Sequence, residues 1–161
     1  MTKEMSGHRP VSAAWPSFHE RLTETLQTME EDQFLIVMVK GSNRYVQFAA
    51  QGFYGMRAET VADTYLEPAE RLTAEEIAIL GVLGWGQPTS GPGATPQDDP
   101  DGSPNYFREW TPPADYAEIA ALAVRTLLEI HDVAHPGWLT YNAFDAEGNE
   151  IHLPDLGLKE A

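Results

Sequence analysis

The chain has 161 residues, a size that fits one domain with its own core, and its 42% hydrophobic content argues against wholesale disorder. It carries 10 Lys and Arg against 25 Asp and Glu, and the net charge of -15 argues against nucleic acid and anionic membranes as partners, while it would suit a basic client. Because the chain has no cysteine, it has neither a disulfide framework nor a thiolate metal site.

The N-terminal residues read as a loose arm. Residues 1–14 are expected to be flexible, and the first ten are polar and lack the apolar run of a signal peptide. The longest apolar run, Ile77 to Trp85, is too short for a membrane helix. We therefore expect a cytoplasmic protein.

The first helix is expected to begin at a capping box formed by Ser17 and Glu20, because a hydroxyl and a carboxylate at this spacing close the first helical turn. Acidic residues 30–32 oppose the helix dipole and favour its end. The next segment, Phe34 to Val39, is apolar at every position, which suits a strand covered on both faces or one at a dimer seam.

Two further strands, residues 44–50 and 53–61, complete a three-stranded antiparallel meander. If Gln51 and Gly52 form a two-residue turn, Arg44 lies opposite Glu59 and makes a cross-strand ion pair with it.

A second capping box, Thr73 to Glu76, opens a short apolar helix that ends near Gly84. Residues 87–105 are rich in Pro, Gly and Asp and predict a mobile loop inside the domain. Tyr106 to Trp110 follows as a short aromatic strand.

The third helix opens at residues 111–115, and its broad apolar stripe runs to Ile130. Trp138 to Phe144 is the candidate for a further strand, and residues 148–161 look loosely attached. The pattern predicts an α+β fold in one domain, residues 15–147, with an antiparallel sheet flanked by helices. The sheet consists of the meander and one or two later strands.

No motif for metal, cofactor or catalytic chemistry emerges. His131 and His135 have a chelating spacing, but Pro136 ends the helix beside the second and no third ligand is placed. The acidic residues 98–101 lack the spacing of a calcium loop. The glycines between 81 and 93 follow no strand and precede no Gly-Lys-Ser/Thr. We expect no metal and no cofactor.

Aromatic residues are the more informative group. Trp85, Tyr106, Phe107 and Trp110 bracket the predicted loop. Tryptophan and tyrosine are enriched at binding hot spots, but they also fill cores, and the sequence leaves both roles open.

Three short motifs carry a family resemblance. Tyr45-Val46-Gln47-Phe48, Ala58-Glu59 and Leu83-Gly84-Trp85 resemble the actinobacterial TY-Chap family, which is grouped with type III secretion chaperones and YbjN proteins. The resemblance implies peptide binding without catalysis, frequent dimerisation, and an antiparallel sheet with a helix on each side. The positions that carry over are Tyr45, Gln47, Phe48, Glu59 and Trp85.

The leading hypothesis is therefore a peptide-binding chaperone or adaptor that holds an extended client on an apolar and aromatic surface. The proposed binding residues are Tyr45, Gln47, Phe48, Glu59, Trp85 and Trp110. Two alternatives remain: a small enzyme with acidic residues in a cleft, and an acidic inhibitor or immunity-type protein that blocks a basic partner. A homodimer is expected as well, because the segments Phe34–Val39 and Ile77–Leu83 are more apolar than a one-faced layer requires.

Overall fold

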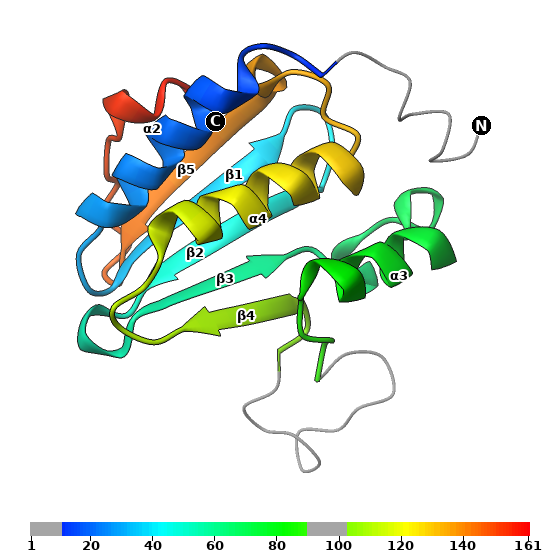
Figure 1. The fold of residues 1–161 in the computed structure, drawn as a ribbon, viewed down its shortest axis with the longest axis horizontal. Coiled ribbons are helices and arrows are strands. Elements are labelled where there is room, and N and C mark those ends of the chain that lie inside the picture. Colours follow the sequence, from blue (N-terminus) through cyan, green and yellow to red (C-terminus); the bar gives the residue numbers. More distant parts are fainter. Residues whose placement is uncertain (1–10, 90–102) are drawn as a thin grey trace.

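The computed structural model describes residues 11–89 and 103–161, as an open sheet with helices packed on it (Figure 1). In chain order, its longer elements are α2 (Trp15–Thr28), β1 (Gln33–Val39), β2 (Tyr45–Ala50), β3 (Met56–Thr60), α3 (Ala74–Leu83), β4 (Tyr106–Trp110), α4 (Tyr116–Glu129), β5 (Leu139–Asp145) and β6 (Lys159–Glu160).

The sheet has six strands in the order β4-β3-β2-β1-β5-β6. All neighbours are antiparallel except β5 and β6, which run parallel. The expected α+β class, the antiparallel meander β1-β2-β3 and both later strands are confirmed. The strand from the C-terminal part of the chain, β5, lies beside β1 and puts the first strand in the middle of the sheet.

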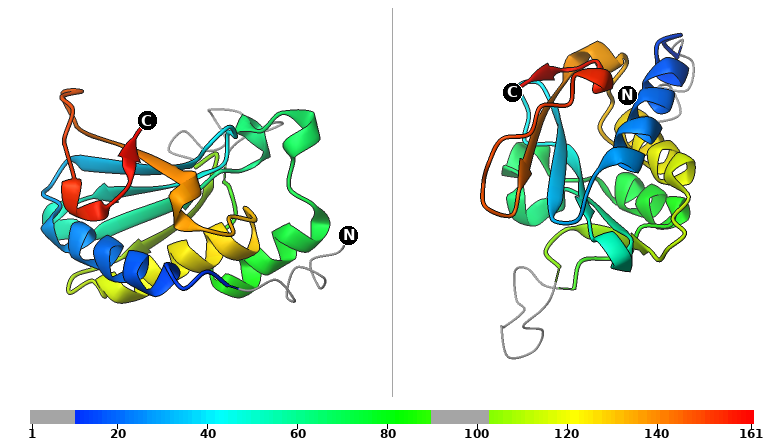
Figure 2. Two further views of the ribbon diagram at one scale, coloured as in Figure 1. Left: turned by 90° about the horizontal axis from the view of Figure 1, so that it is seen from above. Right: turned by 90° about the vertical axis from the view of Figure 1, so that its left-hand side faces the viewer.

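The described α-helices all lie on one face of the sheet (Figure 2). Side chains alternate along a strand, so every second residue of each strand meets the helices. On β1 these residues are Leu35 and Val37, which are buried, whereas Phe34, Ile36 and Met38 face the other side and are half-buried. Among the described residues, the arrangement differs from the one implied by the family resemblance, a helix on each side, and none of their helices covers the second apolar face of β1.

The core is built from the helix stripes and the covered sheet face. Phe18, Leu22 and Leu26 of α2 are fully buried, as are Leu127 of α4 and Leu80 of α3. The third helix is therefore structural, as its apolar stripe predicts.

Of the two predicted capping boxes, one forms and the other does not. Thr73 and Glu76 form a capping box, in which each side chain accepts a hydrogen bond from the backbone N–H of the other residue. Ser17 does not cap: α2 already begins at Trp15, and the Ser17 hydroxyl accepts a hydrogen bond from Arg21 one turn later. Proline in the first turn of α2, where no N–H is needed, allows the earlier start.

The predicted ion pair between Arg44 and Glu59 is wrong, because the hairpin turn is longer than two residues. The turn contains a short 3-10 segment, and the Gln51 N–H donates to the Gly55 carbonyl. Gly55 has a φ of 104°, a conformation that suits glycine. The longer turn shifts the register so that Gln47 faces Glu59.

Arg44 instead joins the sheet to the helical layer. Its guanidinium donates to the carbonyls of Glu70 at 2.7 Å and Ile130 at 3.0 Å, and it lies 3.5 Å from the carboxylate of Glu76. The residue is a structural anchor between β2 and the ends of α3 and α4.

The C-terminal segment 148–161, expected to be loose, packs along the edge of the sheet. Leu156 is fully buried, its carbonyl accepts a hydrogen bond from Arg21, and β6 pairs with β5. The turn that leads into the segment is held by Asp145, whose pKa is lowered chiefly by hydrogen bonds from Asn149. Most of the predicted arm 1–14 (residues 1–10) and most of the predicted mobile loop 87–105 (residues 90–102) lie outside the described residues.

Candidate functional site

The uncovered face of the sheet carries an unusual set of side chains. Cross-strand pairing aligns them in rows, and one row crosses five strands. This row consists of Glu109, Arg57, Ala49, Phe34 and Phe144. It changes from charged on β3 and β4 to aromatic on β1 and β5, with the smallest side chain in the middle.

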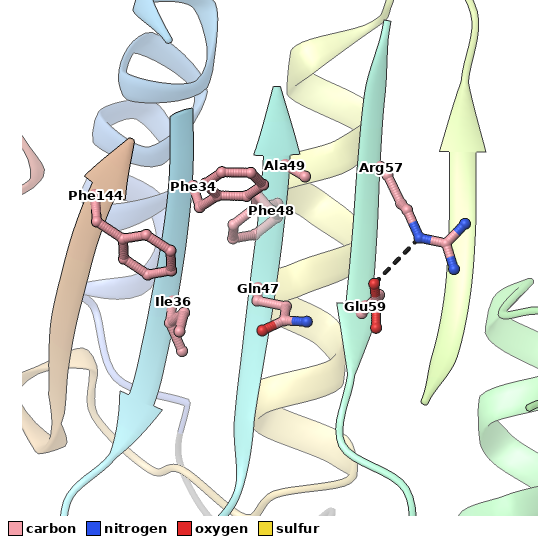
Figure 3. Close-up of a pocket in the computed structure, with 8 residues that line it drawn as sticks. All are labelled: Phe34, Ile36, Gln47, Phe48, Ala49, Arg57, Glu59 and Phe144. Carbon is pink, nitrogen blue, oxygen red and sulfur yellow. Dashed lines mark hydrogen bonds and ion pairs between the residues drawn. The ribbon is translucent and has the colours of Figure 1, made fainter. Parts of the chain in front are cut away.

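A hollow of about 240 Å³ opens at this small side chain (Figure 3). Ala49 lies between the ring of Phe34 and the long side chain of Arg57, and neither neighbour fills the space above it. Ile36 and Gln47 line the same hollow one row further along. We call this the sheet groove. It has an apolar wall and a polar wall.

The apolar wall is a pair of stacked rings. Phe34 and Phe144 are direct cross-strand partners, with ring centroids 5.4 Å apart and planes inclined by 26°. Both side chains are half-buried although none of the described helices covers them. A stacked aromatic pair at a partly open surface is a typical binding feature.

The polar wall is organised around Arg57. Its Nε donates to Glu59 at 3.1 Å, its terminal nitrogen donates to Glu109, and its guanidinium lies 4.6 Å from the ring centroid of Phe107. One cation is thus shared between two carboxylates. The wall keeps a net negative charge, and its geometry is fixed from three sides.

Asn105 extends this network into the loop before β4. Its side chain, 2% exposed, donates to the carboxylate of Glu59 at 3.2 Å and to the phenol oxygen of Tyr45 at 3.0 Å, and accepts from the N–H of Ala62. Burial raises the pKa of Tyr45, as does the negative charge of Glu59, although the bond from Asn105 lowers it. The phenol therefore stays protonated at physiological pH and keeps its O–H as a donor.

A second hollow lies further along β2. It has a volume of about 370 Å³ and is lined by Met38, Tyr45 and Tyr65 together with the turn residues 42–44. Tyr45 and Ala49 lie on the same face of β2, four residues apart, which corresponds to roughly 13 Å along a strand. Gln47 lies between them, and its amide makes no hydrogen bond to any residue that the structure describes.

Comparison with known protein families matches residues 8–145 to TY-Chap3, described as a "T3SS (YopN, CesT) and YbjN peptide-binding chaperone 3". The chain belongs to the TY-Chap3 family. No curated protein and no solved structure gave a significant match. The match ends at Asp145, so the segment that covers the edge of β5 lies beyond it.

The residues expected to bind in this TY-Chap3 protein divide between two faces. Tyr45, Gln47 and Glu59 lie together on the open face. Phe48, Trp85 and Trp110 point into the core with exposures of 2%, 4% and 8%.

The two tryptophans have different surroundings. The indole N–H of Trp85 donates to the Thr126 hydroxyl at 3.0 Å, which explains why a polar aromatic residue is buried there. The indole nitrogen of Trp110 is buried without a partner among the described residues. Phe34, Ala49, Arg57, Asn105 and Phe144 are site residues that sequence reasoning missed.

The described ranges, residues 11–89 and 103–161, contain neither a metal-binding cluster nor a membrane-spanning helix. No group of three or more His, Asp or Glu within them is placed to hold a metal ion. None of the helices in those ranges has both the length and the apolar character that crossing a membrane demands.

Proposed function

We propose that this TY-Chap3 protein is a non-catalytic chaperone or adaptor that binds an extended segment of a client protein in the sheet groove. The observation that carries the proposal is the groove itself, an apolar hollow between a stacked Phe pair and a fixed polar wall on a sheet face that no described helix covers. Membership of a peptide-binding chaperone family supports the same kind of ligand.

The edges of the sheet are poor alternatives for strand addition. On the outer side of β4, Gly86 already exchanges both backbone hydrogen bonds with Phe107, and residues Thr111–Pro113 follow directly. On the outer side of β5, Ile151 and Ala161 donate to the carbonyls of Ala143 and Tyr141. Because both edges are largely occupied, the face offers more room for a client than the edges do.

Side chains on the open face supply what an extended segment needs. Apolar side chains of the client enter the hollows at Ala49 and Tyr45. The side-chain amide of Gln47 and the phenol of Tyr45 form hydrogen bonds with the main chain of the client. Phe48, Trp85 and Trp110 are buried in the core, so their contribution is to the stability of the fold that holds the open face.

Filling the groove tests the proposal. Peptides selected from a displayed library of short random sequences would be synthesised with a fluorophore and titrated by fluorescence polarisation. Ala49→Trp places an indole in the hollow and should weaken binding by more than about tenfold. Ala117→Trp, at an exposed position on α4 and so on the helical side of the sheet, is the matched control. Equal affinity for both variants and the wild type would place the binding site elsewhere.

A further inference from the structure

Acidic turns flank the aromatic wall of the sheet groove. Residues 30–32, Glu-Glu-Asp, lead into β1 just before Phe34, and Glu147 and Glu150 follow β5 just after Phe144. Since β1 and β5 are antiparallel and these two rings are partners, both turns lie at the same end of the sheet (Figure 1). All five carboxylates belong to exposed residues.

The open face offers almost no compensating positive charge. On the five longer strands, the open-face residues are Phe34, Ile36, Met38, Tyr45, Gln47, Ala49, Arg57, Glu59, Phe107, Glu109, Thr140, Asn142 and Phe144. Arg57 is the one Lys or Arg among these described positions, and it is shared by Glu59 and Glu109. On the short edge strand β6, the exposed Lys159 pairs with Thr140 and adds one cation, at the end of β5 opposite to Phe144 and the acidic turns. The groove is thus apolar inside and negative around it.

Building on the proposed function, we infer that the client segment is basic: a short apolar stretch in extended conformation, flanked by lysine or arginine. The apolar side chains enter the groove, and the flanking cations reach the acidic turns and the Glu59–Glu109 wall. Long basic side chains also pack their aliphatic stems and cationic heads on aromatic rings such as Phe144.

Charge decides between this client and a second copy of the chain on the same face. A second copy docked on this face would set its acidic turns and its Glu59–Glu109 wall against those of the first, so this arrangement is repelled. A basic segment is attracted, and complementary charge favours both fast association and choice of partner.

The experiment uses three synthetic peptides that share one apolar stretch of alternating leucines and are flanked by Lys, Ser or Glu. Each is titrated against the full chain by fluorescence polarisation at low and at physiological salt. The Lys-flanked peptide should bind at least about tenfold more tightly than the Ser-flanked one at low salt, and this preference should shrink as salt screens the charges.

Neutralising variants locate the effect. The triple change Glu31→Gln, Glu147→Gln and Glu150→Gln, which alters only the acidic turns outside the groove, should reduce the preference for Lys without abolishing binding of the Ser-flanked peptide. The exposed pair Glu20→Gln and Glu24→Gln on α2, on the helical side of the sheet, is the control and should leave the preference nearly unchanged.

The outcomes separate this inference from the proposed function. If the Lys- and Ser-flanked peptides bind equally and Ala49→Trp weakens both, the groove binds peptides but the basic client is refuted. If the Lys-flanked peptide binds the Ala49→Trp variant as tightly as it binds the wild type, its binding is a surface charge effect outside the groove, and the inference fails. If no peptide binds at all, the proposed function falls as well.

Discussion

Single residues of the polar wall explain how an exposed sheet face keeps a fixed shape. A surface ion pair alone contributes little, because solvent and side-chain freedom oppose it. Here Arg57 is held by two carboxylates and a ring, and Glu59 is held in turn by the buried amide of Asn105. The buried amide is therefore the residue on which the order of the wall depends most.

Asn105→Ala should destabilise the protein by ~1–3 kcal/mol, because the N–H of Ala62 loses its acceptor in a buried position. Equilibrium unfolding in urea measures the change. Asn142→Ala, an exposed position on the open face of β5, is the matched control and should stay within about 0.5 kcal/mol of the wild type. Equal effects of the two substitutions would show that the Asn105 network carries no stability.

Three of the six binding residues proposed from the sequence lie on the open face, and strand register explains the division. The family motif pointed to Tyr45, Gln47 and Glu59, which all share the open face. It also pointed to Phe48, whose position next to Gln47 turns it to the opposite face. The partners Arg57 and Phe144 come from distant segments, and only the actual pairing of β2 with β3 and of β1 with β5 brings them to the groove.

At the scale of elements, local signals predicted the helices and the meander well. The Thr73 capping box and the apolar stripe of α4 placed both helices, because these signals depend on neighbours along the chain. The hairpin register and the C-terminal segment failed for the opposite reason. The turn after β2 depends on the conformation of Gly55. The attachment of residues 148–161 depends on contacts with distant parts of the chain: Leu156 is buried, Arg21 of α2 donates to its carbonyl, and β6 pairs with β5.

Leu156→Ala should lower the free energy of unfolding by ~2–5 kcal/mol, the range for a fully buried leucine. Urea unfolding or a thermal melt followed by circular dichroism provides the measurement. Val11→Ala, at a side chain 67% exposed, serves as the control. A decrease in the free energy of unfolding no larger than that of the control would mean that the segment is only loosely attached, as the sequence suggested.

At the scale of the whole molecule, two of the places that expose apolar side chains bear on association; other exposed ones lie in turns, such as Phe53 and Trp138. The sheet groove is one, and its acidic surroundings favour a basic client over a second copy. The outer side of α3 is the other: Ile77 is 39% and Val82 is 86% exposed, although this helix is apolar along most of its length. Exposed apolar residues concentrated on one helix are a feature of interfaces between chains.

A homodimer through α3 is therefore the last prediction. It covers Ile77 and Val82 while leaving the groove open, and apolar burial drives it against the repulsion between two chains of charge -15. Sedimentation equilibrium at micromolar concentration should give a dimer mass at physiological salt, with stronger association as salt rises. Val82→Glu should give a monomer that still binds peptide, whereas Ala69→Glu, with the same added charge elsewhere, should remain a dimer. A wild-type monomer at every salt concentration would refute dimerisation and leave the apolar side of α3 to a different protein.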